Sequence, residues 1–405
     1  MRLALTTLAA LAIAGAAQAK TITVKPGGDD QEKLQTALID AKPGDTVQLA
    51  AGTYRLTDGL SLDVDGVTVK GAGQDKTTLD FTGQMGGAEG LLITSNRNTI
   101  RDLTVLNSKG DGIKAKGSDQ ISFVSLTVAW SGPPKETNGS YGVYPVSSTN
   151  VLIDKVTVRG ASDAGIYVGQ SKNIVLKRSK AEFNVAGIEI ENSLNADVFD
   201  NVSTHNAGGI LVFDLPNLPM QGGAYHRVFR NKVVDNDTQN FAPKGNIVAS
   251  VPTGTGVMVM ANKNVHVFGN EIAGNKTAGV MIVGFQREIK DAAYEALPID
   301  ISVHDNTFGK NGWAPDFAGG DQIAKAAGGI IPPVLWDGAA SFTRNGVKET
   351  RALNVDFKDG PVMNLRLPLV TALILANPQV TPTLPGKPVA EPKPVTLPPA
   401  QAKLA

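Results

Sequence analysis

The sequence predicts an all-β fold in which the chain winds into a single-stranded parallel β-solenoid of about ten coils. A phrase of glycine, apolar, variable and apolar residues recurs at steps that are mostly near 22 residues. A second phrase keeps the same period, and no long helical pattern separates the copies. These features are typical of stacked repeats. The copies begin at Gly90, Gly112, Gly142, Gly165, Gly187, Gly209, Gly256 and Gly279.

The residue after each glycine is expected to point into the solenoid, because side chains alternate between the two faces of a strand. Parallel stacking would then align these residues in one buried apolar column. The expected column comprises Ile113, Ile166, Ile188, Ile210, Val257 and Val280. The residue that follows each of them should point outward.

Two columns of asparagine accompany the glycine phrase. One contains Asn201, Asn231, Asn270 and Asn306, and the other contains Asn184, Asn206, Asn236, Asn275 and Asn311. Two interpretations are open. The amides could hydrogen-bond from coil to coil, or asparagine could simply tolerate the left-handed backbone of a tight corner. Both interpretations require a solenoid.

The ends of the chain suggest three segments. Residues 1–19 have the pattern of a secretory signal peptide: Arg2, an apolar stretch and an Ala17-Gln18-Ala19 cleavage site. Residues 20–376 would form the solenoid domain, with a capping helix near 31–41 that protects its open edge. Residues 377–405 are rich in proline and are expected to be a disordered tail.

Composition narrows the classes of partner. Lys and Arg number 38, as do Asp and Glu, so no broad basic surface is expected and a nucleic-acid partner is disfavoured. The chain contains no cysteine and therefore no disulfide. Beyond the leader, no apolar stretch is long enough to span a bilayer. We expect a periplasmic or secreted protein that is not membrane-spanning.

Four insertions interrupt the period, and in solenoids such insertions form loops on one flank. Residues 131–140 and 238–255 precede a glycine strand, whereas residues 215–225 and 286–298 follow one. They are expected to wall a groove over the outward face of the glycine strands. The alternative is that they cover apolar outward positions and stabilise the fold.

The outward positions of the glycine strands supply the candidate site. Lys114, Tyr144, Tyr167 and Glu189 occupy successive copies, and Asp163 lies just before its strand. Aromatic faces beside polar groups suit a sugar, although a solvated strand can also carry such residues by chance. The candidate substrate-binding residues nearby are Asp111, Glu191, Asp214 and His226.

Several motifs resemble the right-handed parallel β-helix superfamily, which includes pectate lyases, polygalacturonases and alginate epimerases. The first is Leu34-Gln35-Thr36-Ala37 followed by Pro43-Gly44-Asp45. More narrowly, Ser162–Gln170, Gly208–Pro216 and Leu335–Gly338 are similar to an uncharacterised family of exported bacterial β-helix proteins. The resemblance covers nearly all of residues 20–345 and implies a right-handed parallel β-helix. It implies no established activity.

The chain departs from the better-known relatives at their catalytic motifs. The Asp-Pro-His-Asp motif of alginate epimerases is absent. Pectate lyases use clustered calcium-binding carboxylates and an arginine. Here the available carboxylates are not expected to converge, so calcium is an option and no cofactor is required from the sequence. These carboxylates are Asp200, Asp214, Asp235 and Asp237.

Two classes of function remain open. An enzyme could abstract the proton α to a uronate carboxylate, with Lys114 neutralising the carboxylate, Tyr144 and Tyr167 as base and acid, and Glu189 or Asp163 orienting them. A hydrolase would instead pair Asp163 with Glu189. A non-catalytic binding or scaffold module would use the same groove, or the tail, to hold a glycan or an exported protein partner.

Overall fold

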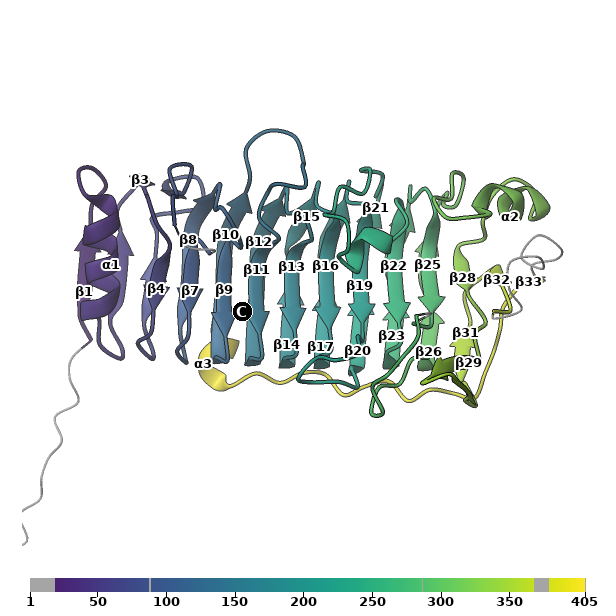
Figure 1. The fold of residues 1–405 in the computed structure, drawn as a ribbon. Coiled ribbons are helices and arrows are strands. Elements are labelled where there is room, and N and C mark those ends of the chain that lie inside the picture. The colour runs from purple at the N-terminus through teal and green to yellow at the C-terminus, as the bar shows by residue number, and fades with distance from the viewer. Residues whose placement is uncertain (1–18, 87–88, 286, 368–378, 405) are drawn as a thin grey trace, which may run out of the picture.

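The computed structural model describes residues 19–86, 89–285, 287–367 and 379–404. Over these residues the chain forms a right-handed parallel β-helix of about 13 turns, stacked in one row from β1 to β32 (Figure 1). The sequence predicted about ten coils. The additional coils lie at the two ends, outside the eight glycine copies from Gly90 to Gly279, where β1 pairs with β2 and β28 pairs with β32.

One face of the β-helix is a sheet that, in the described residues, has 12 strands. Its final strand, β33, is antiparallel to β32, and the other pairings are parallel. In spatial order the strands are β4 (Leu60–Leu62), β7 (Leu91–Ile93), β9 (Ile113–Lys116), β11 (Tyr141–Val146), β13 (Ala164–Gly169), β16 (Ala186–Glu191), β19 (Gly208–Phe213), β22 (Thr255–Met260), β25 (Ala278–Val283), β28 (Val334–Trp336), β32 (Val362–Asn364) and β33 (Gln379–Thr381).

The rest of the wall is a sheet with 19 strands in the described part of the chain. These are β1 (Thr21–Val24), β2 (Thr46–Leu49), β3 (Gly52–Arg55), β5 (Thr68–Lys70), β6 (Thr77–Asp80), β8 (Thr99–Leu106), β10 (Asp119–Ala129), β12 (Thr149–Arg159), β14 (Lys172–Lys177), β15 (Lys180–Glu182), β17 (Leu194–Phe199), β18 (Val202–Thr204), β20 (Ala224–Phe229), β21 (Lys232–Val234), β23 (Lys263–Phe268), β24 (Glu271–Ala273), β26 (Ile299–His304), β27 (Thr307–Phe308) and β31 (Val355–Phe357). A separate hairpin joins β29 (Ser341–Arg344) to β30 (Val347–Thr350).

The inward apolar column is confirmed. Strand register aligns Val143 with Ile166 and Ile166 with Ile188, and the alignment continues to Val280. Each predicted member is fully buried. Because β-branched side chains pack well on a pleated surface, this column accounts for the continuous core of the β-helix.

The helices lie outside the coils. α1 (Asp30–Asp40) is the predicted cap, and it buries Leu34, Ala37 and Leu38 against the first coil. Two short helices, α2 (Gly320–Ala326) and α3 (Pro399–Ala402), occur near the far end of the β-helix and in the tail. No helix of the described residues is long and apolar enough to cross a membrane.

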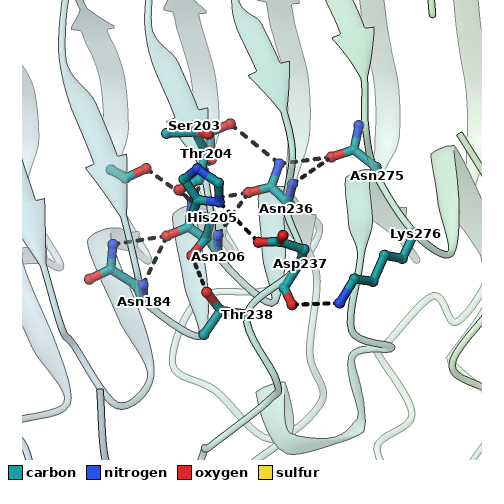
Figure 2. Close-up of polar contacts among 11 residues, drawn as sticks. Asn184, Ser203, Thr204, His205, Asn206, Asn236, Asp237, Thr238, Asn275 and Lys276 are labelled. Carbon is teal, nitrogen blue, oxygen red and sulfur yellow. Dashed lines mark hydrogen bonds and ion pairs between the residues drawn. The ribbon is translucent and has the colours of Figure 1, made fainter. Parts of the chain in front are cut away.

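The asparagine columns are hydrogen-bonded ladders. Asn206 Nδ2 donates to Asn236 Oδ1 at 3.1 Å, and Asn236 Nδ2 donates to Asn275 Oδ1 at 2.9 Å (Figure 2). The left-handed backbone falls on the residue before each of these two asparagines, His205 and Asp235. The coil-to-coil interpretation is therefore confirmed, and tolerance of a left-handed φ does not explain the asparagines.

The C-terminal segment 379–404, which we call the strap, runs back along the solenoid (Figure 1, yellow). It is extended, as its prolines indicate, but it is docked where the sequence predicted disorder. Leu397 packs in an apolar cluster with Leu152 and Val175. Gln401 Nε2 donates to the carbonyls of Ile121 and Asn150 at 3.0 and 2.9 Å. These contacts offset the entropy lost on ordering the strap. Residues 1–18 and 368–378, which include nearly all of the predicted signal peptide and the predicted domain end, lie outside the described residues.

Candidate functional site

Four of the predicted catalytic residues meet on the outer face of the 12-stranded sheet. Register pairs Lys114 on β9 with Tyr144 on β11, and Tyr167 on β13 with Glu189 on β16. The rings of Tyr144 and Tyr167 are 4.9 Å apart between centroids. The four side chains therefore form one continuous column across four neighbouring coils.

Tyr141 also belongs to this column, although the glycine pattern did not predict it. Its ring centroid lies 4.5 Å from those of Tyr144 and Tyr167, so three tyrosines form one cluster. Tyr141 occupies the position that Ala164 and Ala186 fill in the next coils. Comparing that position from copy to copy would have singled it out as the large polar exception.

Three buried carboxyls lie beside the tyrosines. Asp163, Glu189 and Glu191 are only 7%, 3% and 8% exposed. Asn246 Nδ2 donates to Asp163 Oδ2 at 2.9 Å, and Tyr167 Oη donates to Glu191 Oε1 at 2.5 Å. Glu189 Oε2 has no hydrogen-bond partner among the described residues. Such crowding of buried carboxyls is costly unless they hold protons.

The electrostatics of the three carboxyls follow from this burial. Burial raises the pKa of Asp163 to about 7, against the effect of the Asn246 hydrogen bond. Burial also raises the pKa of Glu191 to about 7, although the hydrogen bond from Tyr167 opposes the rise. For Glu189, burial and the charges of Glu191 and Asp163 raise the pKa well above its usual range. The cluster can therefore take up and release protons near neutral pH.

The tyrosines are poor bases in this setting. Burial raises the pKa values of Tyr141, Tyr144 and Tyr167 above the ordinary value, and neighbouring carboxylates raise them further, although the charge of Lys114 opposes the rise at Tyr144. At neutral pH they remain phenols that donate hydrogen bonds. The pKa directions thus favour the carboxyls over the tyrosines as the base of any reaction at this site.

The Lys114 end of the column is the more accessible end. Lys114 Nζ lies 3.0 Å from Glu89 Oε1 and 3.5 Å from Asp111 Oδ2, and 4.8 Å from the centroid of the Tyr144 ring. The lysine side chain is 22% exposed. Burial raises the pKa of Asp111 to about 6, against the charge of Lys114. The end near Lys114 thus combines a cation, acids and an aromatic face.

Insertion 238–255 covers the other end of the column. It contains the short 3-10 turn η1 (Val248–Ser250), and Val248 and Val251 pack in an apolar cluster with Leu211 and Met258. The covering interpretation of this insertion is confirmed. Asp163 and Glu191 beside it keep only 7% and 8% of their surface exposed, so this end of the column is a narrow opening and not the open groove predicted from the sequence.

The insertions 215–225 and 286–298 contact one another. Gln221 Nε2 and the backbone N–H of Asn217 both donate to Asp291 Oδ2. Asp214, a predicted substrate-binding residue, is fully buried, and its carboxylate accepts from the backbone N–H groups of Gly222 and Gly223 at 3.1 and 3.0 Å. Burial raises its pKa to about 6. The Asp214 carboxylate therefore joins the two ends of insertion 215–225 through these backbone hydrogen bonds. Gln286 lies outside the described residues.

His226 does not belong to the site, which corrects its assignment as a substrate-binding residue. Register places it between Ala196 and Val265 in a column that points into the β-helix. It is fully buried, and burial lowers its pKa to about 3. The sequence placed His226 correctly beside an insertion, but strand alternation turns its side chain inward.

In the described part of the chain, the acidic side chains do not gather into a metal site. Within the ranges that the structure describes, no group of three or more His, Cys, Asp or Glu residues is arranged to hold a metal ion.

A family model described as "Right handed beta helix region" matches residues 89–240. Among solved structures, the Mannuronan C-5 epimerase AlgE4 A-module of Azotobacter vinelandii is 18% identical, with a TM-score of 0.52, covering 72% of this chain and 87% of that chain. The GH136 lacto-N-biosidase of Eubacterium ramulus is 14% identical, with a TM-score of 0.52, covering 71% and 64%. No curated protein matches the chain. At these identities the likeness concerns the fold.

Proposed function

We propose that this right-handed parallel β-helix protein binds a polysaccharide at the Lys114–Glu191 column and performs acid–base chemistry on a uronate sugar. One observation carries the proposal. Asp163, Glu189 and Glu191 are buried together against three tyrosines. Burial raises the pKa values of Asp163 and Glu191 to about 7 and that of Glu189 well above its usual range. A cluster of titratable groups tuned near neutral pH is typical of functional sites.

The fold alone gives no reason to keep these carboxyls. Apolar residues occupy the same outward column in later coils, where Leu211, Met258 and Met281 pack beneath the insertion. Replacing Glu189 by such a residue would remove a buried oxygen that lacks a partner. Because buried unpaired acids reduce stability, their presence supports a chemical role.

The side chains suggest a division of roles. Lys114 would pair with the uronate carboxylate and so acidify the proton on the adjacent carbon. Tyr141 and Tyr144 would bind the sugar ring through their faces. Asp163 and Glu191 would serve as base and acid, with Tyr167 holding Glu191 in place through its hydrogen bond.

Proton transfer at this site has two outcomes. The ionised carboxyl takes the proton α to the uronate carboxylate, and the resulting electron pair is held as an enolate-like anion. In a lyase, that pair forms a C=C bond and expels the glycosidic oxygen, which takes a proton from the other carboxyl. In an epimerase, the other carboxyl returns a proton to the opposite face of the same carbon.

A non-catalytic binding module is the second candidate, favoured by the burial of Asp163, Glu189 and Glu191 beneath insertion 238–255. In that case the half-buried residues near Lys114 would bind a glycan, and the acids would play no chemical part. The two candidates differ in what Glu191→Gln does: an enzyme loses turnover, whereas a binding module keeps its affinity.

The test is incubation of the full chain with a panel of uronate polysaccharides, with calcium or with a chelator. Absorbance of unsaturated ends reports a lyase, exchange of the C5 proton by NMR reports an epimerase, and reducing ends report a hydrolase. We expect activity on one polymer that falls about 100-fold in Glu191→Gln. The control Glu182→Gln changes an acid paired with Lys180 on another sheet and should leave activity unchanged. Activity that survives Glu191→Gln would contradict the assignment.

We propose further that the protein is exported to the periplasm or secreted. Support comes from the leader-like pattern of residues 1–19. N-terminal sequencing of protein recovered from the periplasm or medium should begin at Lys20. A chain that retains Met1 and stays in the cell would refute this.

A further inference from the structure

A column of left-handed corner residues runs along the 19-stranded sheet, one in each successive coil. Strand register aligns its members, whose φ values lie between 49° and 66°. Asn and Asp adopt this conformation at low cost, and Tyr does not. Tyr225 is the one aromatic residue among these members. The column is Gln120, Asn150, Asn173, Asn195, Tyr225, Asn264 and Asp300.

Tyr225 interrupts a chain of amide hydrogen bonds. Asn150 Nδ2 donates to Asp119 Oδ1 at 2.8 Å, Asn173 Nδ2 to Asn150 Oδ1 at 3.2 Å, and Asn195 Nδ2 to Asn173 Oδ1 at 3.3 Å. The next position holds a phenol in place of an amide. Among the described residues, no donor reaches Asn195 Oδ1. The chain of amides thus ends in an open acceptor beside an aromatic ring that is 46% exposed.

The strap supplies the opposite wall. A cavity of about 430 Å³ lies between the strap residues 392–396 and the side chains of Asn173, Asn195 and Tyr225. Two contacts fix the strap here. Arg227 Nε donates to Glu391 Oε1 at 2.8 Å, and the N–H of Val395 donates to Asp197 Oδ2 at 3.0 Å. Proline-rich backbone loses little entropy on binding, so this wall is preformed.

We propose that this cavity is a binding site for a neutral sugar unit, separate from the carboxyl column. Its volume lies within the range of small-ligand pockets. Tyr225 offers an aromatic face for the apolar side of a sugar ring, and Asn195 offers an acceptor for a hydroxyl. No carboxylate lines the cavity, and Lys393 is the one charged residue among those that do. The site needs none of the acid–base chemistry proposed above.

A purely structural role accounts poorly for Tyr225. Tyr225 combines a ring that is 46% exposed with a φ of 66°, so burial of the ring does not offset the cost of its backbone conformation. Backbone strain that is not repaid by burial points to a function. Asparagine, which its neighbours carry, would relieve the strain and extend the amide chain.

The test uses the full chain and three neutral disaccharides, maltose, cellobiose and lactose, measured by saturation-transfer NMR. We expect millimolar binding of at least one sugar. Tyr225→Asn should weaken that binding at least tenfold while Tm stays equal or rises. Tyr225→Phe, which keeps the ring, should retain most of the binding. The matched control is Gln120→Asn, elsewhere in the column, which should bind as the wild type does.

The outcomes separate the proposal from its rivals. No binding of any of the three sugars, or binding that survives Tyr225→Asn, would overturn it. A fall in Tm in Tyr225→Asn would assign the tyrosine to packing of the strap and would also overturn it. Glu191→Gln should leave this binding unchanged, so failure here and failure at the carboxyl column can be told apart.

Discussion

Two columns of buried polar side chains run along this β-helix, and they differ in how their hydrogen bonds are met. In the asparagine ladder, Asn236 accepts from Asn206 and donates to Asn275 and to the carbonyl of Ser203. In the carboxyl column, Glu189 keeps an oxygen without a partner among the described residues. Equal burial thus has opposite consequences for stability.

The chemistry of the two groups explains the difference. An amide is donor and acceptor at once, so the same bond repeats from coil to coil without limit. An ionised carboxylate only accepts, so neighbouring carboxyls must hold protons or repel one another. A repeated amide is therefore a structural device, and a cluster of buried carboxyls is a chemical one. Three predictions test this comparison, and one more extends it to His226, a buried polar group outside both columns.

The largest effect is expected at the centre of the asparagine ladder. Asn236→Ala leaves the backbone N–H of Asn206 without its acceptor, although Asn206 Nδ2 keeps the carbonyl of Ala181. The substitution also removes the hydrogen bonds of the Asn236 amide to Asn206 and Asn275. One buried donor left unpaired costs about 1–3 kcal/mol and each lost hydrogen bond contributes about 1 kcal/mol, so the free energy of unfolding should fall by about 4 kcal/mol. Urea denaturation measures this. Lys232→Ala, at an exposed ion pair with Glu271, should change stability by less than about 0.5 kcal/mol. Similar losses in both variants would contradict the ladder's role.

The carboxyl column should make stability depend on pH. The folded pKa of Glu191, about 7, exceeds its ordinary value of 4.5, so the folded state binds the proton more tightly than the unfolded state. Stability is then greatest below pH 4.5 and is lost as pH rises through 7. The loss for this residue is on the order of 3 kcal/mol.

Glu191→Gln should remove that share of the slope between pH 4.5 and 8. Denaturation midpoints at both pH values measure it. The variant keeps an acceptor for Tyr167, so the comparison isolates the charge. Glu182→Gln serves as the control and should retain the wild-type slope. If Glu191→Gln retains it as well, the column does not titrate as described.

A third buried polar group, His226, belongs to neither column, and its effect should have the opposite sign. Its folded pKa of about 3 lies below its ordinary value of 6.5. The folded state therefore binds the proton less tightly, and stability is lost as pH falls from 6.5 towards 3. At pH 5 the loss is about 2 kcal/mol. His226→Leu should lack this loss, so the difference in stability between pH 7 and pH 5 in urea denaturation should be smaller than in the wild type by that amount. An unchanged acid slope would show that His226 reaches solvent.

The smallest effect on stability is expected where the carboxyl column has a good hydrogen bond. Tyr167→Phe removes the donor to Glu191 and should cost about 1 kcal/mol. If the proposed function holds, turnover should fall far more than stability does. Thermal denaturation and the uronate assay, run on the same preparation, give both numbers. If turnover falls only in proportion to the fraction of folded protein, Tyr167 has a structural role and no part in the reaction.

Much of the fold could be predicted from the sequence, because each coil of a repeat protein repeats the same pattern of residue types at a nearly constant spacing. The inward column from Ile113 to Val280, the capping helix and the asparagine ladders could all be recognised in the sequence. The candidate column of Lys114, Tyr144, Tyr167 and Glu189 followed from the same register. Tyr141 was missed because it precedes the glycine phrase, and His226 was misplaced because its insertion obscured the strand alternation.

The sequence by itself determined the coil period, the stacking partners and the side of the sheet on which the site residues lie. These depend on local alternation and nearest-neighbour pairing. Tertiary structure alone decided that insertion 238–255 packs beside the carboxyls, that the strap docks, and that Asp163 and Glu191 hold protons near neutral pH. Each of these depends on contacts between residues far apart in the chain, because burial and desolvation arise only when distant segments exclude water together.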